Sequence, residues 1–277
     1  MGGVVWIASY PRSGNTWVRV FLHALLNVLD GREEFDLNTL AEFSTWDIAS
    51  QWYEPLLGKP PDEVTKEAVA AVRPMAQRRI ADSVDGLVFV KTHAALVKDR
   101  GTPTIDMTRT AGAVYVVRNP LDVAISYARH LSMPIARSVY ILNTPRFETD
   151  NFPKAVYEFY GSWSQHVTSW SRRHHPAVRV VRYEDLLAEP LTAFTGLADH
   201  LRIEASREQI RSALRLASFD RLSALEAKTG FREKPLESSG FFRQGTAGQW
   251  RGELPRHLVD EIIAAHGDTM HRFGYLP

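Results

Sequence analysis

Short apolar runs alternate with longer amphipathic stretches along this chain. Four of the runs are continuous and rich in β-branched residues, which predicts buried strands rather than strands with one face in water. They are Val4–Ser9, Leu87–Thr92, Ala113–Arg118 and Val178–Tyr183.

Between the strands, apolar residues recur at helical spacing. This pattern predicts helices over Asn15–Leu29, Pro120–Leu131, Ala155–Arg173, Pro190–Leu201, Arg207–Leu216 and Pro255–Phe273. Strands that alternate with helices predict an α/β fold: a doubly wound, mainly parallel sheet with helices on both faces and right-handed crossovers, like a P-loop nucleotide-binding fold. The 277 residues suffice for one such core and are short for two, so we expect a single domain over 1–277.

Two segments have no clear period. Residues 30–85 hold an aromatic-rich stretch with Trp46, Trp52 and Tyr53, and residues 132–153 hold scattered proline and asparagine. Long connections in an α/β domain are often lids or walls of a substrate pocket. The three aromatic residues could equally plug the edge of the core, and the sequence leaves both roles open.

Composition narrows the function classes. The net charge is +1, with 44% hydrophobic and 23% charged residues, which does not favour nucleic acid or an anionic membrane as a partner. There is no cysteine, so thiolate metal sites are excluded and a reducing compartment is suitable. No apolar run reaches the length of a transmembrane segment. We therefore expect a soluble, cytoplasmic protein whose oligomeric state stays open.

The loop after the first strand has the residues of a phosphate cradle. It reads Arg12-Ser13-Gly14-Asn15-Thr16 and leads into a helix, so backbone N–H groups, hydroxyls and a cation can converge on one anion. The loop lacks the Gly-Lys-Ser/Thr ending of a Walker A motif, which argues against ATP or GTP hydrolysis.

Further polar residues follow the other predicted strands. Lys91 and His93 end the second strand, Arg118 the third and Tyr183 the fourth. Because ligands bind at the carboxyl ends of such strands, these side chains should gather beside the loop. Histidine is the best side-chain base near pH 7, and Lys91 faces the same side of its strand.

Together these segments resemble the sulfotransferases that use 3′-phosphoadenosine-5′-phosphosulfate (PAPS). Tyr10–Trp17 resembles their phosphate-binding loop, Tyr-Pro-Lys-Ser-Gly-Thr-Thr-Trp. Lys91-Thr92-His93 resembles their Lys-Thr-His segment. Three more segments match in family order: Arg118–Ser126 (Arg-Asn-Pro-x-Asp-x-x-x-Ser), Tyr183–Leu186 (Tyr-Glu-Asp-Leu) and Arg243–Trp250 (Arg-Lys-Gly-x-x-Gly-x-Trp).

The resemblance implies a role for each matching residue. His93 would be the catalytic base, with Lys91 and Arg12 neutralising the leaving phosphate. The residues that would bind the cofactor are Arg12, Ser13, Gly14, Asn15, Thr16, Trp17, Arg118, Ser126, Tyr183, Ser218, Phe219, Phe242, Arg243, Gln244 and Gly245. Three of these positions depart from the family pattern: Arg12 replaces a lysine, Asn15 a threonine and Gln244 a lysine.

The implied reaction is transfer of a sulfuryl group from PAPS, which leaves as adenosine 3′,5′-bisphosphate, to a hydroxyl or amine of a small-molecule, natural-product or lipid acceptor. We expect no metal, since protein cations cover the charge. Two alternatives stay open: a kinase-like phosphoryl transferase, which would need Mg²⁺ ligands that the motifs lack, and a non-catalytic nucleotide-binding protein. Aromatic residues near Trp46 and the absence of long basic runs favour an apolar or aromatic alcohol over a polyanionic sugar.

Overall fold

A five-stranded parallel sheet forms the centre of the computed structural model, which describes residues 2–32, 34–234, 240–242 and 245–276. In the order β2-β3-β1-β6-β7 the strands are Ser44–Trp46, Leu87–Thr92, Gly3–Ser9, Thr110–Val117 and Val178–Arg182. A short antiparallel pair, β4 (Lys98–Asp99) and β5 (Thr102–Pro103), lies outside this sheet. The four predicted strands and the fold class are confirmed. Strand β2 was missed because three residues are too short for a pattern.

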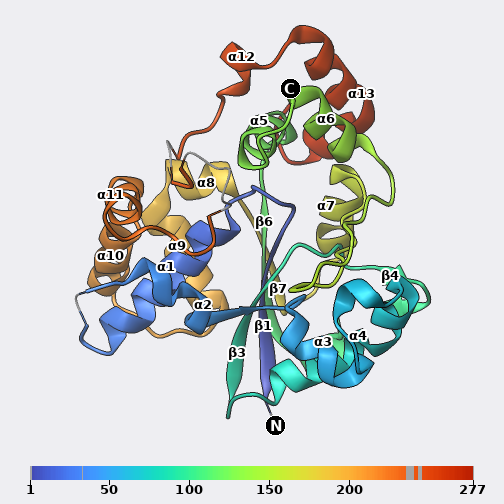
Figure 1. Ribbon diagram of the computed structural model, residues 1–277. Coiled ribbons are helices and arrows are strands. Elements are labelled where there is room, and N and C mark those ends of the chain that lie inside the picture. The colour runs from blue at the N-terminus through green and yellow to red at the C-terminus, as the bar shows by residue number, and fades with distance from the viewer. Residues whose placement is uncertain (1, 33, 235–239, 243–244, 277) are drawn as a thin grey trace.

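Helices cover both faces of the sheet (Figure 1). They are α1 Asn15–Leu29, α2 Leu40–Phe43, α3 Ser50–Leu57, α4 Lys66–Ala81, α5 Pro120–His130, α6 Ile135–Asn143, α7 Trp163–Ser171, α8 Tyr183–Ala188, α9 Pro190–His200, α10 Arg207–Leu216, α11 Phe219–Thr229, α12 Trp250–Glu253 and α13 Arg256–Arg272. None of them, within the described part of the chain, combines the length and apolar character needed to cross a bilayer.

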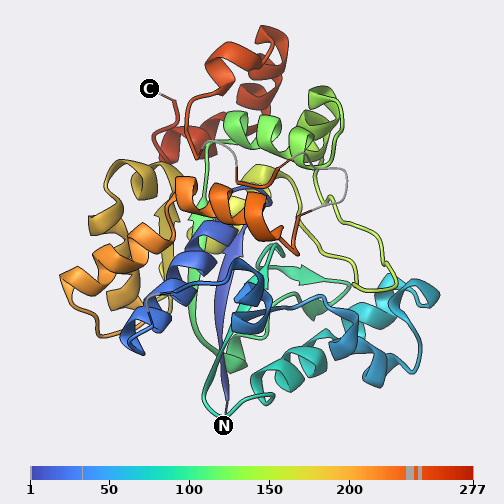
Figure 2. The ribbon, with the colours of Figure 1, turned by 60° about the vertical axis from the view of Figure 1, so that its left-hand side comes forward.

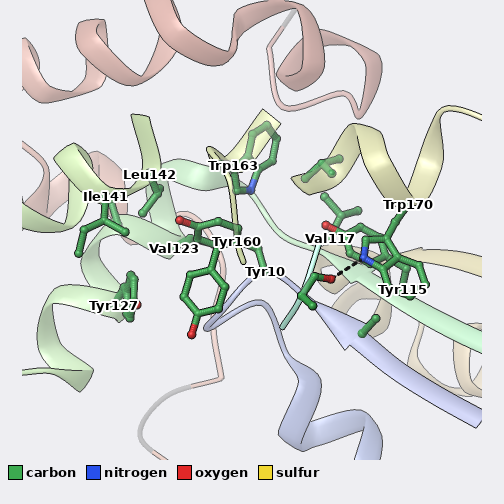
Figure 3. Close-up of a cluster of buried hydrophobic side chains, with 14 of the residues drawn as sticks. Tyr10, Tyr115, Val117, Val123, Tyr127, Ile141, Leu142, Tyr160, Trp163 and Trp170 are labelled. Carbon is green, nitrogen blue, oxygen red and sulfur yellow. Dashed lines mark hydrogen bonds between the residues drawn. The ribbon is translucent and has the colours of Figure 1, made fainter. Parts of the chain in front are cut away.

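Successive side chains of β6 point to opposite faces of the sheet and join two separate hydrophobic clusters. Tyr115 and Val117 belong to one cluster, together with buried residues of α5, α6, α7 and α13. Val114 and Val116 point to the opposite face and join α1, α9 and α10. Figure 3 shows the first cluster, where Trp163 and Trp170 of α7 lie near the strands. Figure 2 shows α5, α6 and α13 gathered above the sheet. The sheet is therefore buried on both sides, as its apolar strands predict.

The predicted helix over residues 155–173 is wrong in its first half. The helix begins at Trp163, because Ser162 caps it in a capping box with Gln165, and Gly161 before it has a φ of 67°. Ala155 instead forms isolated bridges in an extended segment. Capping chemistry and a left-handed glycine thus outweigh the helical spacing of the aromatic residues.

The two segments without a clear period contain regular elements. The first carries α2, β2, α3 and α4, and the second carries α6. Tyr53 is fully buried in a small cluster with Val69 and Tyr157, so it does plug the edge of the core. Trp46 keeps 37% of its surface exposed at the end of β2, beside Lys91. The two aromatic residues therefore differ in role.

Candidate active site

The phosphate loop is a tight turn between β1 and α1. Arg12 has a φ of 66° and Gly14 a φ of 109°, both in the left-handed region. A Cβ on Gly14 would lie 2.7 Å from a ring carbon of Tyr183, so only glycine permits this contact. The Ser13 hydroxyl is buried and has no hydrogen-bond partner in the described structure. A buried donor of this kind is available to a bound anion.

Asn15 and Thr16 open helix α1, but the Asn15 side chain turns inward. Its amide donates a 2.7 Å hydrogen bond to the carbonyl of Ile7 and fastens the helix to β1. We therefore assign this side chain to the scaffold, while the N-terminus of α1 still points toward the loop. Thr16 is half-buried in the first turn.

A cavity of about 290 Å³ lies beside the loop and gathers predicted residues from distant segments. Six of the predicted donor-binding residues line it: Arg12, Arg118, Ser126, Tyr183, Phe219 and Gly245. Arg129 was not predicted and adds a third guanidinium to the same cavity. The single acidic residue of the described lining is Asp122. Three arginines against one carboxylate favour an anion in this space.

Among the described residues, Arg118 forms no ion pair with Asp122, which lies four residues further along the chain. Asp122 instead accepts hydrogen bonds from the backbone N–H groups of Gly248 (2.7 Å) and Trp250 (3.1 Å), which fixes the C-terminal loop. Arg118 donates to the carbonyls of Arg12 and Thr246, both at 3.1 Å. Its Nε is buried without a hydrogen-bond partner among the described residues, so donor capacity remains.

The Arg12 guanidinium contacts two residues of α5, Ser126 and His130. Its Nε donates to Ser126 Oγ at 3.2 Å, and Nη1 lies 3.2 Å from Nδ1 of His130. The guanidinium also stacks on Phe241, 4.8 Å from the ring centroid. Burial and the neighbouring charges of Arg12 and Lys91 lower the pKa of His130 to about 3, so this imidazole is neutral and can accept from Arg12.

Hydrogen bonds from several parts of the chain hold His93 in place. Its Nδ1 lies 2.8 Å from the Ser9 carbonyl, an acceptor only, so Nδ1 carries the proton and Nε2 is the basic nitrogen. Its backbone N–H donates to Glu158 at 2.9 Å, and its carbonyl accepts from His166 at 2.9 Å. Burial, reinforced by the charge of Lys91, lowers the pKa of His93 well below the usual range. The ring is therefore neutral at pH 7.

Lys91 lies beside His93, as the alternation of the strand predicts. Its ammonium is 4.6 Å from the centroid of the Trp46 ring, a cation–π distance. Burial lowers the pKa of Lys91, and the nearby carboxylates of Glu233, Glu158 and Asp47 act in the opposite direction. A cation in this position can meet negative charge that develops at the edge of the sheet.

The nearby aromatic residues form the remaining wall. The Trp17 indole donates to the Ala217 carbonyl at 3.0 Å, and its ring packs on Phe219 and Tyr183 at 5.0 and 5.9 Å. A Cβ on Gly245 would lie 2.3 Å from the Phe219 ring. These flat side chains suit a stacked nucleobase.

Comparison with known proteins identifies the family. The family model of the sulfotransferase domain matches residues 3–274. The chain belongs to the sulfotransferase domain family. This match covers the phosphate loop, the Lys91–His93 segment and the Arg118 segment in one alignment.

The curated relatives of this sulfotransferase include proteins named for luciferin and for flavonol. It is 24% identical to luciferin sulfotransferase of Photinus pyralis, covering 91% of this chain and 68% of that one. It is also 24% identical to flavonol 3-sulfotransferase of Flaveria bidentis (93% and 78% covered) and 27% identical to cytosolic sulfotransferase 12 of Arabidopsis thaliana (92% and 74%).

Solved structures support the fold of the sulfotransferase. Retinol dehydratase, in complex with androsterone and the inactive cofactor PAP, aligns with a TM-score of 0.64 at 19% identity, covering 96% of this chain and 80% of that one. A mouse sulfotransferase complexed with PAP aligns at 0.62 and 18% identity, covering 97% and 84%. Here PAP is adenosine 3′,5′-bisphosphate.

Seven of the described residues that were predicted to bind the donor are not among the residues lining the cavity. Four of them, Ser13, Gly14, Asn15 and Thr16, belong to the phosphate loop and the start of α1, and the other three are Phe242, Ser218 and Trp17. Phe242 is packed in the core against Phe231, and its neighbour Phe241 faces the cavity instead. Ser218 is exposed at the N-terminus of α11, where its hydroxyl donates to the Arg215 carbonyl. Trp17 packs behind Phe219. Arg243 and Gln244 lie outside the described residues.

Sequence reasoning missed two groups of functional neighbours. Arg129 and His130 lie three and four residues after Ser126, on the same helix face, so helical spacing could have indicated them. Glu158 and Asp47 left no such signal, because they reach the His93 segment from other parts of the chain. Burial raises the pKa of both carboxyls, and the charge of Glu158 raises the pKa of Asp47 further.

Proposed function

We propose that this sulfotransferase uses PAPS as its donor and sulfates a hydroxyl of a small apolar or aromatic molecule. The observation that carries the proposal is His93, whose Nδ1 bonds the Ser9 carbonyl so that Nε2 is the basic nitrogen. His93 and Lys91 lie at the end of β3, at the same carboxyl-terminal sheet edge as the cavity lined by three arginines. A base, a cation and an anion site at one sheet edge are what in-line sulfuryl transfer requires.

The residues of the cavity fit an adenosine bisphosphate. Arg118, Ser126 and Arg129 would hold the 3′-phosphate, since the Nε of Arg118 has an unused donor. Ser13 and the loop amides would hold the 5′-phosphate. When bound, PAPS supplies the sulfuryl group and departs as adenosine 3′,5′-bisphosphate. Tyr183 and Phe219 would contact the base.

Side chains of this protein would remove the proton from the acceptor and stabilise the negative charge that develops on the leaving group. His93 Nε2 would take the proton from the acceptor hydroxyl, because the bond from Nδ1 to Ser9 leaves only that nitrogen basic. Lys91, with Arg12, would stabilise negative charge on the leaving side. Among the described residues no group of three His, Cys, Asp or Glu could hold a metal ion, and the proposed roles use none.

The names of the relatives and the position of Trp46 support the acceptor class. Luciferin and flavonol give the curated relatives their names, and the structural neighbour was solved with androsterone. Trp46, half-exposed beside Lys91, offers a flat apolar surface near the reaction centre. A phenol, a natural-product alcohol or a lipid alcohol suits this surface better than a polyanionic sugar. We place the reaction in the cytoplasm, as the relatives named cytosolic suggest.

One experiment separates this proposal from its alternatives. Incubation with PAPS and a panel of phenols, sterols and fatty alcohols should yield a product 80 Da heavier, read by mass spectrometry. Binding of adenosine 3′,5′-bisphosphate without turnover on any acceptor would favour a non-catalytic nucleotide-binding protein. Phosphate transfer from ATP–Mg²⁺ instead would favour the kinase-like alternative.

A further inference from the structure

A second cavity, larger than the donor cavity, lies along α7 and is also lined by residues within 95–98 and 172–178. Its volume is about 900 Å³, which is in the range of cavities that bind small molecules. Its floor is apolar and includes Leu96, Met107, Phe159, Trp170 and Val178. We call this cavity the α7 groove. It shares no described lining residue with the donor cavity.

The polar atoms of the floor are already used within the protein. The indole N–H of Trp170, whose ring Figure 3 shows in the core beside the sheet, donates to the Ala94 carbonyl at 3.0 Å. The Ser169 hydroxyl donates to the His166 carbonyl and accepts from the Leu96 N–H. A ligand that lies on this floor therefore finds apolar surface rather than free hydrogen-bonding groups, and an alkyl chain suits it.

The lining also has an unbalanced charge. Five basic residues surround the floor, and no carboxylate of the described chain is among the lining residues. This basic rim consists of Lys98, Arg146, Arg172, Arg173 and His175. All five are exposed, so the charges of the lysine and the three arginines are accessible to a ligand. The fifth, His175, accepts a hydrogen bond at Nδ1 from the Ala177 N–H. The protein as a whole is nearly neutral, so this concentration of one sign is local.

Arg146 of the basic rim contacts the apolar floor directly. Its guanidinium stacks on the Phe159 ring, 5.2 Å from the centroid, and reaches Asp99 only at 3.8 Å. Asp99 is already bound more closely by Arg100 and Tyr157. The charge of Arg146 is thus held at the edge of an apolar surface, where one ligand could touch both.

From this arrangement we infer that the α7 groove binds a single-chain anionic amphiphile, with the alkyl chain on the floor and a carboxylate or similar head group on the basic rim. The inference does not depend on sulfuryl transfer, since the groove and the donor cavity are separate. Charge complementarity selects this ligand over a neutral lipid or a cationic one.

The test is calorimetric titration of the intact protein with a homologous series of carboxylates. Dodecanoate should bind, and each methylene removed should weaken binding about fourfold, the equivalent of about 0.8 kcal/mol of buried CH₂. Dodecanol and dodecyltrimethylammonium at the same concentrations, below micelle formation, should bind at least tenfold more weakly. Equal binding of all three would overturn the inference.

Variants locate the binding. Lys98→Glu with Arg173→Glu should weaken dodecanoate binding at least tenfold, and Thr168→Trp, which fills the groove, should do the same without changing charge. Arg79→Glu, an exposed arginine on α4, is the matched control and should bind normally. Thermal midpoints check that the variants fold. If dodecanoate binds all variants equally and competes with an acceptor, it binds in the active site and the inference is refuted. The inference is also refuted if the protein binds anionic vesicles but not free dodecanoate.

Discussion

Replacing Arg118 tests the donor site most directly. In the structure its guanidinium lines the anion cavity, stacks 4.4 Å above the Tyr183 ring and spans the carbonyls of Arg12 and Thr246. Arg118→Ala would remove the proposed charged contact to the 3′-phosphate, and the loss of such a contact at a buried position typically costs about 2–5 kcal/mol. Arg12 and Arg129 face the same cavity and offset part of this loss. We therefore expect the lower half of the range.

That loss corresponds to about a 30- to 300-fold weaker Kd for adenosine 3′,5′-bisphosphate, measured by isothermal titration calorimetry. Arg118→Lys keeps the positive charge but cannot bind the phosphate through two N–H groups as a guanidinium does. It should therefore recover about half of the binding free energy that Arg118→Ala loses. Arg207→Ala, an exposed arginine at the start of α10, is the control and should bind like the wild type.

Stability has to be measured beside affinity. Arg118→Ala also breaks the two hydrogen bonds to backbone carbonyls, each worth about 1.5–3 kcal/mol for a charged donor, so the free energy of unfolding should fall. A variant that is less stable but binds the bisphosphate within twofold of the wild type would show that Arg118 is only structural and that the phosphate lies elsewhere.

Four further predictions follow from the same geometry. His93→Ala should lower kcat by about 10²–10⁴-fold on an aliphatic alcohol and less on an acidic phenol, with bisphosphate affinity unchanged; near-normal kcat on the alcohol would make His93 structural. Adenosine 3′,5′-bisphosphate at 100 times its Kd should add about 2.7 kcal/mol to unfolding, and ATP–Mg²⁺ much less, read by thermal shift; the reverse order would refute the donor assignment. Gly14→Ala should cost about 2–4 kcal/mol in unfolding from strain and the clash with the Tyr183 ring, whereas Gly31→Ala, also at positive φ but with open space, should cost less. Burial lowers the pKa of His166 and His266 to about 4, below the unfolded value near 6.5. The stability that they contribute is therefore full above pH 6.5 and is lost as the pH falls toward 4. Between pH 6.5 and 5 the free energy of unfolding, measured with denaturant, should fall by about 2 kcal/mol per histidine, and a flat profile would contradict this.

The sequence by itself determined the parts of the fold that local pattern specifies. Strand β1, the phosphate loop and α1 follow from an apolar run, a glycine at a left-handed turn and a helical period, all within residues 3–29. The residues Lys91, His93 and Arg118 could be assigned to one sheet edge because parallel strands end on the same side. These inferences needed only the period of each element and the rule of parallel topology.

The tertiary structure alone decided which of these residues share a space. Glu158 meets the N–H of His93 across 65 positions of sequence, and Asp47 meets Thr92 across 45. Phe241 rather than Phe242 faces the donor cavity, although the two are neighbours in the sequence just before the same motif. The pKa of His93 likewise depends on burial and on Lys91. Contacts between distant segments and exclusion of water arise only when the layers pack, so no local pattern encodes them.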